Sequence, residues 1–305
     1  MRVVCCLDYC KKLSIIESVF KMYEKTNNLL KIARECNTAV IAFICMDYVM
    51  ARSVVYAAEK TNTPAIIMLY PEHVSVQHTT GLFNYATMVK ELANEVSVPI
   101  GLHADHDYTY EAVKRSVDAG FESIMIDGSM YSLEENIAIT KKIVSKVHGV
   151  GVFVEGEIGH IGLAETSDNY KEDLYTKPEA AKKFCDETGV DALAISIGNA
   201  HGEYKSIPRL DIERLKKIHE ITDVPLVLHG GSGIPDDQLL VAFANGINKF
   251  NLGTEFLKKY YSAIEDYIQY SKNDSNPVKV IEMPQYVQSK LQTYLEGRLR
   301  TLCRF

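Results

Sequence analysis

Residues 100–106, IGLHADH, join a short apolar run to a cluster of histidines and carboxylates. Similar short segments, rich in β-branched residues, recur along the chain, and we expect eight of them to be strands. These eight segments are residues 39–46, 65–70, 100–106, 123–129, 151–159, 192–198, 226–233 and 249–254. Their nearly continuous hydrophobicity is typical of parallel strands that are covered on both faces.

The segments between these strands carry helix signals. In residues 109–120, Ala112, Val113 and Val117 share one helical face, and Gly120 stands where a helix would end. Eight such strand and helix units in about 250 residues are typical of an α/β fold of the (β/α)8 TIM-barrel type. An open doubly wound sheet is less consistent with the sequence, because no Gly-x-Gly-x-x-Gly turn follows the first strand.

Composition and charge limit the partners of the protein. The chain has 305 residues, 47% hydrophobic and 24% charged, which is enough to bury a large core. Its net charge of -7 argues against nucleic acid, and no apolar run is long enough to predict a membrane span. We therefore expect a small-molecule partner. Seven cysteines without paired spacing, and a start without a signal-peptide pattern, favour the cytoplasm.

Polar residues that can take part in catalysis or binding gather at the ends of the predicted strands. In TIM barrels the active site lies at the carboxyl ends of the strands, so this clustering predicts a site there. The residues are Asp105, His106, Asp127, Ser129, Glu157, His201, His229, Gly230, Gly231, Ser232, Asn251 and Thr254.

Three histidines, His106, His201 and His229, would converge at that end from the third, sixth and seventh strands. Three imidazoles with an open fourth position are the usual form of a catalytic zinc site. No pair of them has the i, i+4 spacing of a helical zinc motif, so the prediction depends on the barrel. The remaining histidines, His73 among them, are expected to be ordinary polar groups.

The third strand raises a question of direction. Strand alternation puts His103 and Asp105 on one face and His106 on the other. His106 therefore reaches the site only if the strand already turns there. We expect His103 to support the site through hydrogen bonds and Asp107 to lie in solvent at the start of the next helix.

The glycine-rich segments HGGSG (229–233) and NLGT (251–254) follow the seventh and eighth strands. Their backbone N–H groups are free of bulky side chains, and Ser232 and Thr254 add hydroxyl groups. Because TIM barrels commonly bind phosphate in this quadrant, the two segments predict a phosphate cradle.

Five motifs together resemble the class II, zinc-dependent ketose-bisphosphate aldolases, which include fructose- and tagatose-1,6-bisphosphate aldolases. The motifs are LHADHD (102–107), VEGEIGHIG (154–162), ALAISIGNAHGEYK (192–205), LVLHGGSGIP (226–235) and NLGTE (251–255). The resemblance runs from about Met22 to the C-terminal helices. It implies one barrel domain with C-terminal helices over residues 22–305, whereas residues 1–21 form an added helical or flexible extension.

The resemblance also implies an activity. Class II aldolases cleave or form a ketose 1,6-bisphosphate, giving dihydroxyacetone phosphate and an aldehyde. By resemblance, His106, His201 and His229 bind the catalytic Zn²⁺, for which another divalent ion is an alternative, and a monovalent cation is a possible addition. Asp105 matches the acid and base at the C4 oxygen, and Glu165 matches the residue that moves the C3 proton.

Two further sets of residues match the family. Asp127 and Glu157 match carboxylates that hold zinc in an alternative position. The residues that match the site for the dihydroxyacetone phosphate half are Gly202, Lys205, Gly230, Gly231, Ser232, Asn251, Leu252, Gly253 and Thr254. The resemblance further implies a homodimer or homotetramer.

Four positions depart from the family pattern. Ile44 replaces an Asn, Tyr70 replaces a Ser, Ala164 replaces a Gly in the mobile loop, and Gly253 occupies a position that helps to choose the sugar phosphate. These departures predict an altered pocket for the aldehyde half. They leave open an aldolase for another phosphorylated keto sugar or a deoxy-ketonic acid phosphate, an inactive metal-binding barrel, and a non-catalytic subunit.

Overall fold

The computed structural model describes residues 22–73, 81–159, 174–272, 277–303 and 305. Its eight strands form one closed parallel barrel in sequence order, with β8 pairing β1. The strands are β1 (Val40–Ile44), β2 (Ala65–Leu69), β3 (Ile100–Asp107), β4 (Ser123–Ile126), β5 (Phe153–Ile158), β6 (Ala192–Ile195), β7 (Leu226–Leu228) and β8 (Ile247–Leu252). Each coincides with a predicted segment, which confirms the (β/α)8 barrel. The predicted extension, residues 1–21, lies outside the described residues.

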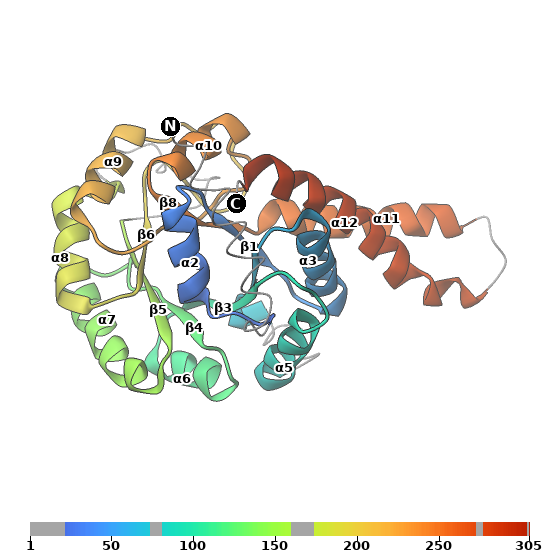
Figure 1. The fold of residues 1–305 in the computed structure, drawn as a ribbon, viewed down its shortest axis with the longest axis horizontal. Coiled ribbons are helices and arrows are strands. Elements are labelled where there is room, and N and C mark those ends of the chain that lie inside the picture. The colour runs from blue at the N-terminus through green and yellow to red at the C-terminus, as the bar shows by residue number, and fades with distance from the viewer. Residues whose placement is uncertain (1–21, 74–80, 160–173, 273–276, 304) are drawn as a thin grey trace.

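Helices surround the barrel (Figure 1). They are α3 (Tyr48–Thr61), α5 (Leu82–Ala93), α6 (Tyr110–Asp118), α7 (Leu133–Val147), α8 (Pro178–Thr188), α9 (Ile212–Ile221) and α10 (Asp236–Ala244), with short 3-10 helices η1 (His148–Val150) and η4 (Pro277–Ile281). Side-chain caps begin several of them, such as Thr109, which accepts a hydrogen bond from the Ala112 N–H. Just after α6, Gly120 has a φ of 96°, which suits the predicted helix end. Among the described helices, none combines the length and apolarity needed to cross a membrane.

Helix α2 (Thr26–Glu35) closes the amino end of the barrel, and Figure 1 shows it lying across the barrel opening. Its fully buried Leu29, Leu30 and Ala33 pack with inward-facing strand residues such as Val40 and Met68. Burial of each leucine side chain contributes roughly 1.5–3 kcal/mol. These apolar side chains fill the amino end of the barrel. The polar groups inside the barrel lie nearer the carboxyl ends of the strands.

The chain ends in two long helices, α11 (Thr254–Ser271) and α12 (Met283–Leu302), which form a hairpin that projects from the barrel (Figure 1). Leu291, Leu295 and Leu299 of α12 are fully buried at four-residue spacing. Helix α12 packs closely against α3, which anchors the base of the hairpin. The predicted C-terminal helical extension is therefore confirmed.

Candidate active site

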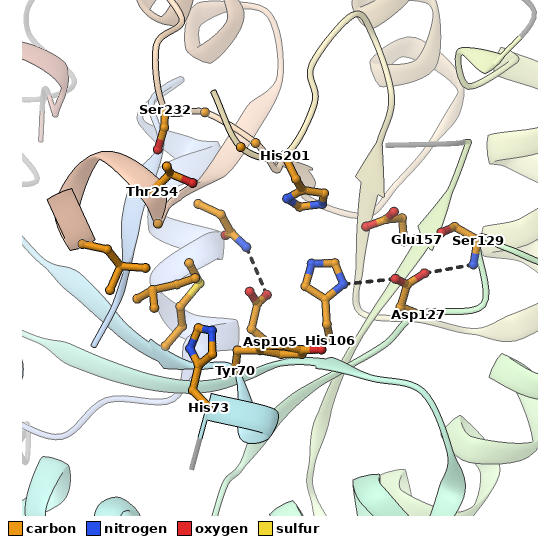
Figure 2. A pocket seen from close by; sticks show the side chains of 18 of the residues that line it. Tyr70, His73, Asp105, His106, Asp127, Ser129, Glu157, His201, Ser232 and Thr254 are labelled. Atoms are coloured by element: carbon orange, nitrogen blue, oxygen red, sulfur yellow. Dashed lines mark hydrogen bonds and ion pairs between the residues drawn. The ribbon is translucent and has the colours of Figure 1, made fainter. Parts of the chain in front are cut away.

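A cavity of about 430 Å³ lies at the carboxyl ends of the strands. Figure 2 shows side chains from several strand ends pointing into it. Nearly all the residues predicted from strand ends line this one cavity: Asp105, His106, Asp127, Ser129, Glu157, His201, Gly230, Gly231, Ser232, Asn251 and Thr254. His229 is fully buried beside the other two histidines. The structure thus brings together the candidate site.

The end of β3 turns His106 into the cavity. His106 has a φ of 51°, in the left-handed region that side-chain-bearing residues rarely adopt. The register between β3 and β4 also shifts between Ala104 and Asp107, which marks a bulge. The condition under which His106 reaches the site is therefore met. Backbone strain of this kind is concentrated at functional sites.

Asp107 does not lie in solvent, so that expectation was wrong. Its side chain is only 3% exposed and accepts a hydrogen bond from the Ser116 hydroxyl at 2.9 Å. Burial raises the pKa of Asp107 to about 6. The β3 bulge explains the difference, because the extra residue turns the Asp107 side chain toward α6, which covers it from solvent.

The three histidines form a cluster that suits a metal ion. One ring nitrogen from each of His106, His201 and His229 lies within 4.8 Å of the others. His106 Nε2 and His229 Nδ1 are 3.2 Å apart, close to the separation of about 3.3 Å between two ligand nitrogens of a tetrahedral zinc. The donor atoms and their spacing therefore fit zinc.

Carboxylates hold the other nitrogens of two of these rings. His106 Nδ1 lies 3.1 Å from Asp127 Oδ2, and His229 Nε2 lies 2.8 Å from Glu155 Oε1. Each carboxylate accepts an N–H and so leaves the opposite nitrogen free to bind a cation. This arrangement is the usual one around metal-binding histidines.

The electrostatics of the cluster also favour a cation. Burial alone would lower the pKa of His106, but Asp105 and the hydrogen bond to Asp127 raise it to about 10. When no metal ion is bound, His106 is therefore protonated and supplies a positive charge at this position. Burial, together with nearby His106, lowers the pKa of His201 to about 3, so His201 stays in the neutral form that binds metals.

A second group of possible ligands shares His106. Its nitrogen and carboxylate oxygens of Asp127 and Glu157 also lie within 4.8 Å of one another. Glu157 Oε2 is buried, has no hydrogen-bond partner among the described residues, and lies 3.7 Å from His229 Nδ1. Burial raises the pKa of Glu157 well above its ordinary value. A buried carboxylate oxygen without a hydrogen-bond donor is stabilised by a proton or by a metal ion.

Asp105 lies beside the histidines and is held by Asn251. The Asn251 side-chain amide donates to Asp105 Oδ1 at 3.1 Å. Burial tends to raise the pKa of Asp105, but nearby positive groups, His106 first, keep it below its ordinary value. Asp105 is therefore ionised at neutral pH and can accept a proton.

A polar layer inside the barrel supports the site from below. Glu155 and Lys249 are fully buried, and their Oε2 and Nζ atoms are 2.8 Å apart. His103 Nδ1 lies 2.7 Å from the Ser123 hydroxyl, and His103 Nε2 lies 3.8 Å from Glu155 Oε2. Among the described residues, His103 belongs to neither group of possible metal ligands. Its position is consistent with the supporting role predicted for it.

Sequence reasoning missed Glu155 and Lys249. Burial tends to raise the pKa of Glu155, but Lys249 brings it below its ordinary value, so the carboxylate remains charged beside His229. The sequence did contain a signal for both residues, because side chains two residues apart on a strand point to the same face. Glu155 precedes Glu157 by two residues and Lys249 precedes Asn251 by two, so both point into the barrel.

The glycine-rich segments pack so closely against their neighbours that side chains would not fit. A Cβ on Gly230, whose φ is 62°, would lie 2.1 Å from the Ala200 carbonyl oxygen. One on Gly231 would lie 1.9 Å from the Phe250 ring. Ser232 Oγ accepts a hydrogen bond from the Glu255 N–H in the first turn of α11. The cradle therefore meets the positive end of a helix dipole, which favours phosphate.

The other predicted substrate residues are placed differently. Gly202 lines both the main cavity and an adjoining one of about 450 Å³, and Lys205 lines only the adjoining one. Gly253 lines the main cavity. Leu252 instead lies in the hydrophobic core, because strand alternation turns it away from the barrel interior. Glu165 and Ala164 lie outside the described residues.

Two departures from the family pattern contact each other. A Cβ on Gly253 would lie 2.9 Å from Ile44 Cδ1, so the glycine makes room for the isoleucine. Tyr70 lies nearby on the wall of the same cavity, and its ring is 4.9 Å from that of His73. Ile44, Tyr70 and Gly253 thus line one cavity.

The comparisons with known proteins agree with this geometry. The family model for class II fructose-bisphosphate aldolase matches residues 24–302. The chain belongs to the class II fructose-bisphosphate aldolase family. The family shows that the protein is an enzyme, an aldolase and therefore a lyase of carbohydrate metabolism.

Individual relatives support the same family. The chain is 33% identical to the fructose-bisphosphate aldolase of Geobacillus stearothermophilus, over 87% of this chain and 91% of that protein. It resembles the crystal structure of the YdjI aldolase from Escherichia coli K12 with a TM-score of 0.79 and 28% identity, covering 91% of this chain and 96% of that one. It also resembles the crystal structure of fructose-bisphosphate aldolase from Campylobacter jejuni, with a TM-score of 0.78 and 23% identity. This match covers 90% of this chain and 93% of that one, and it supports the fold alone.

Proposed function

We propose that the protein is a zinc-dependent aldolase that cleaves a ketose 1,6-bisphosphate, of the fructose or tagatose type, to dihydroxyacetone phosphate and an aldehyde. The observation that carries this proposal is the histidine cluster with Asp105 beside it and a phosphate cradle in the same cavity. Sequence identity of 33% to a fructose-bisphosphate aldolase supports the substrate class.

The residues divide into binding and chemical roles. The cradle of Gly230, Gly231 and Ser232, with the amino end of α11, would bind the phosphate of the dihydroxyacetone phosphate half. His106, His201 and His229 would hold the metal, with Asp127 and Glu157 offering the alternative position. When bound, zinc would act as a Lewis acid toward the enediolate charge that develops on cleavage.

Asp105 carries the proton transfer that breaks the bond. As an ionised carboxylate, it removes the proton of the C4 hydroxyl while the C3–C4 bond breaks, and it returns that proton in the reverse reaction. Asn251, at 3.1 Å, holds the carboxylate in place. In this proposal Glu165 returns a proton to C3.

Exchange of the C3 hydrogen of dihydroxyacetone phosphate tests the proposal without an aldehyde. We expect the enzyme with zinc to exchange this hydrogen with deuterated water, as seen by NMR, and we expect chelation to stop the exchange. Zinc-dependent exchange would support both the metal and the phosphate half of the site. An enzyme that binds zinc and shows no exchange would contradict the proposal and favour an inactive barrel.

One observation favours a second candidate. Ile44 and Tyr70 line the cavity where the family has polar residues, so an aldolase for another phosphorylated keto sugar or a deoxy-ketonic acid phosphate is the alternative. The two candidates share the first half-reaction and differ in the aldehyde released.

We also propose that the enzyme works in the cytoplasm as a homodimer or homotetramer, without nucleic acid or membrane partners. Exposed apolar side chains on the projecting hairpin, Ile268, Tyr270 and Val280, support self-association. Light scattering coupled to size-exclusion chromatography would give the mass of the particle. A monomer at micromolar concentration would contradict the assembly.

A further inference from the structure

The cavity has a second side that the family motifs do not assign. Figure 2 shows Ser232 and Thr254 on one side of Asp105, and Tyr70 and His73 on the other. If the C1 phosphate binds the cradle and Asp105 acts at the C4 oxygen, the carbons beyond C4 lie toward Tyr70 and His73. This step rests on the proposed function.

That side of the cavity is lined by aromatic rings. The Tyr70 ring lies 4.9 Å from His73 and 6.3 Å from His106, and Tyr108 lies 6.3 Å from His106 on the same wall. Within the described part of the chain, no lysine or arginine lines this cavity. Burial lowers the pKa of His73, so its imidazole is neutral at pH 7.

His73 has a nitrogen available for a ligand. His73 Nδ1 is buried and has no hydrogen-bond partner among the described residues, although the side chain lines the cavity. A buried polar atom is costly unless it is satisfied, and a bound hydroxyl group would satisfy it. A neutral imidazole can donate to or accept from a hydroxyl group, whereas a phosphate dianion is better held by cations.

We propose that His73 is a specificity-determining residue that hydrogen-bonds the hydroxyl group next to the carbonyl of the aldehyde substrate. In the ketose this group is the C5 hydroxyl, one carbon beyond the oxygen on which Asp105 acts. The enzyme therefore selects 2-hydroxyaldehydes, and Tyr70 forms the wall against which the carbon chain packs.

The test compares aldehydes that differ in this hydroxyl group. Dihydroxyacetone phosphate is condensed with glyceraldehyde, glyceraldehyde 3-phosphate or propanal, which lacks the hydroxyl group, and kcat/KM is measured for each. For His73→Ala we expect kcat/KM to fall roughly three- to tenfold more with the two hydroxyaldehydes than with propanal, as the loss of one hydrogen bond implies. His73→Gln, which keeps a donor and an acceptor, should recover part of the selectivity.

His148→Ala is the matched control. His148 pairs with Asp191 at the amino end of the barrel, at 2.9 Å, and should leave the ratios between aldehydes unchanged. An equal loss with propanal and glyceraldehyde would show that His73 has only a structural role, and no loss with either would also overturn the proposal.

The hydrogen-exchange assay separates this inference from the proposed function. Wild-type enzyme that exchanges the C3 hydrogen, combined with no selective loss in His73→Ala, would overturn the role of His73 alone. Wild-type enzyme that neither exchanges nor condenses would overturn the proposed function and the inference together.

Discussion

Glu155 Oε1 lies 2.8 Å from His229 Nε2, while the other nitrogen of that imidazole faces His106 across 3.2 Å. A carboxylate buried inside the barrel thus fixes which nitrogen of His229 is available to a metal. Lys249 holds the same carboxylate at 2.8 Å, so the orientation of a metal ligand depends on an ion pair one layer deeper in the barrel.

We expect Glu155→Gln to weaken zinc binding about 10- to 100-fold, because an amide accepts the His229 N–H less strongly than a carboxylate. Competition with a chromophoric chelator measures this affinity. Glu134→Gln, which changes an exposed carboxylate paired with Lys183, is the control. Unchanged zinc affinity in Glu155→Gln would show that Glu155 does not position His229.

Lys249→Met should destabilise the fold strongly, since it leaves the Glu155 carboxylate buried without its cation. We expect a loss of roughly 3–5 kcal/mol in the free energy of unfolding, measured in urea. The double variant Glu155→Gln, Lys249→Met should lose less than Lys249→Met alone. Lys114→Met, which breaks an exposed pair with Asp118, should leave the stability almost unchanged. A similar small cost for Lys249→Met would refute the coupling.

Asp105→Ala should leave zinc bound and still lower the rate of cleavage by roughly 100- to 10,000-fold, because the proton acceptor is removed while the ligands remain. Elemental analysis and a cleavage assay on the same sample give both quantities. Full activity in this variant would remove Asp105 from the mechanism.

His106→Ala, His201→Ala and His229→Ala should each lose zinc together with activity, because each removes one of three metal ligands. Elemental analysis after dialysis measures the metal content. His219→Ala, at a histidine that packs against Gly246 on the outside of the barrel, should keep its zinc. Stoichiometric zinc in any of the three ligand variants would exclude that residue as a ligand.

Asp107→Asn should stabilise the protein at neutral pH. The folded pKa of Asp107 is about 6, above its ordinary value of 3.8, so the fold disfavours the charged form. This penalty is fully present above about pH 6 and disappears as the pH falls toward about 4. We expect a gain on the order of 1–3 kcal/mol at pH 7 that shrinks on acidification.

Thermal unfolding of the metal-free protein between pH 4 and pH 7 would follow this difference without interference from zinc release. Asp118→Asn, at an exposed aspartate, is the control and should show little change with pH. A stability difference for Asp107→Asn that is the same at both ends of this range would contradict the assigned burial penalty.

The strands and the strand ends were predictable because both follow from simple patterns. Continuous apolar runs mark strands covered on two faces, and the barrel places every strand end at one site. His106 was harder, since alternation puts it on the wrong face. The bulge between Ala104 and Asp107 resolves this, and the same bulge buries Asp107.

The polar layer was not predicted, because both faces of a barrel strand are buried and charged residues in such strands give no sign of their partners. Glu155 and Lys249 are 94 residues apart, and only closure of the barrel brings them together. The aromatic wall was predicted only in part. Tyr70 was expected to alter the pocket, whereas His73 and Tyr108 were missed because they follow two different strands and no motif includes them.

The most direct test of the assignment is release of dihydroxyacetone phosphate from a panel of ketose phosphates, measured in a coupled assay with and without chelator. We expect release from at least one ketose 1,6-bisphosphate, its loss on chelation, and its recovery when zinc is restored. No release from any member of the panel by enzyme that carries zinc would contradict the assignment and leave an inactive metal-binding barrel.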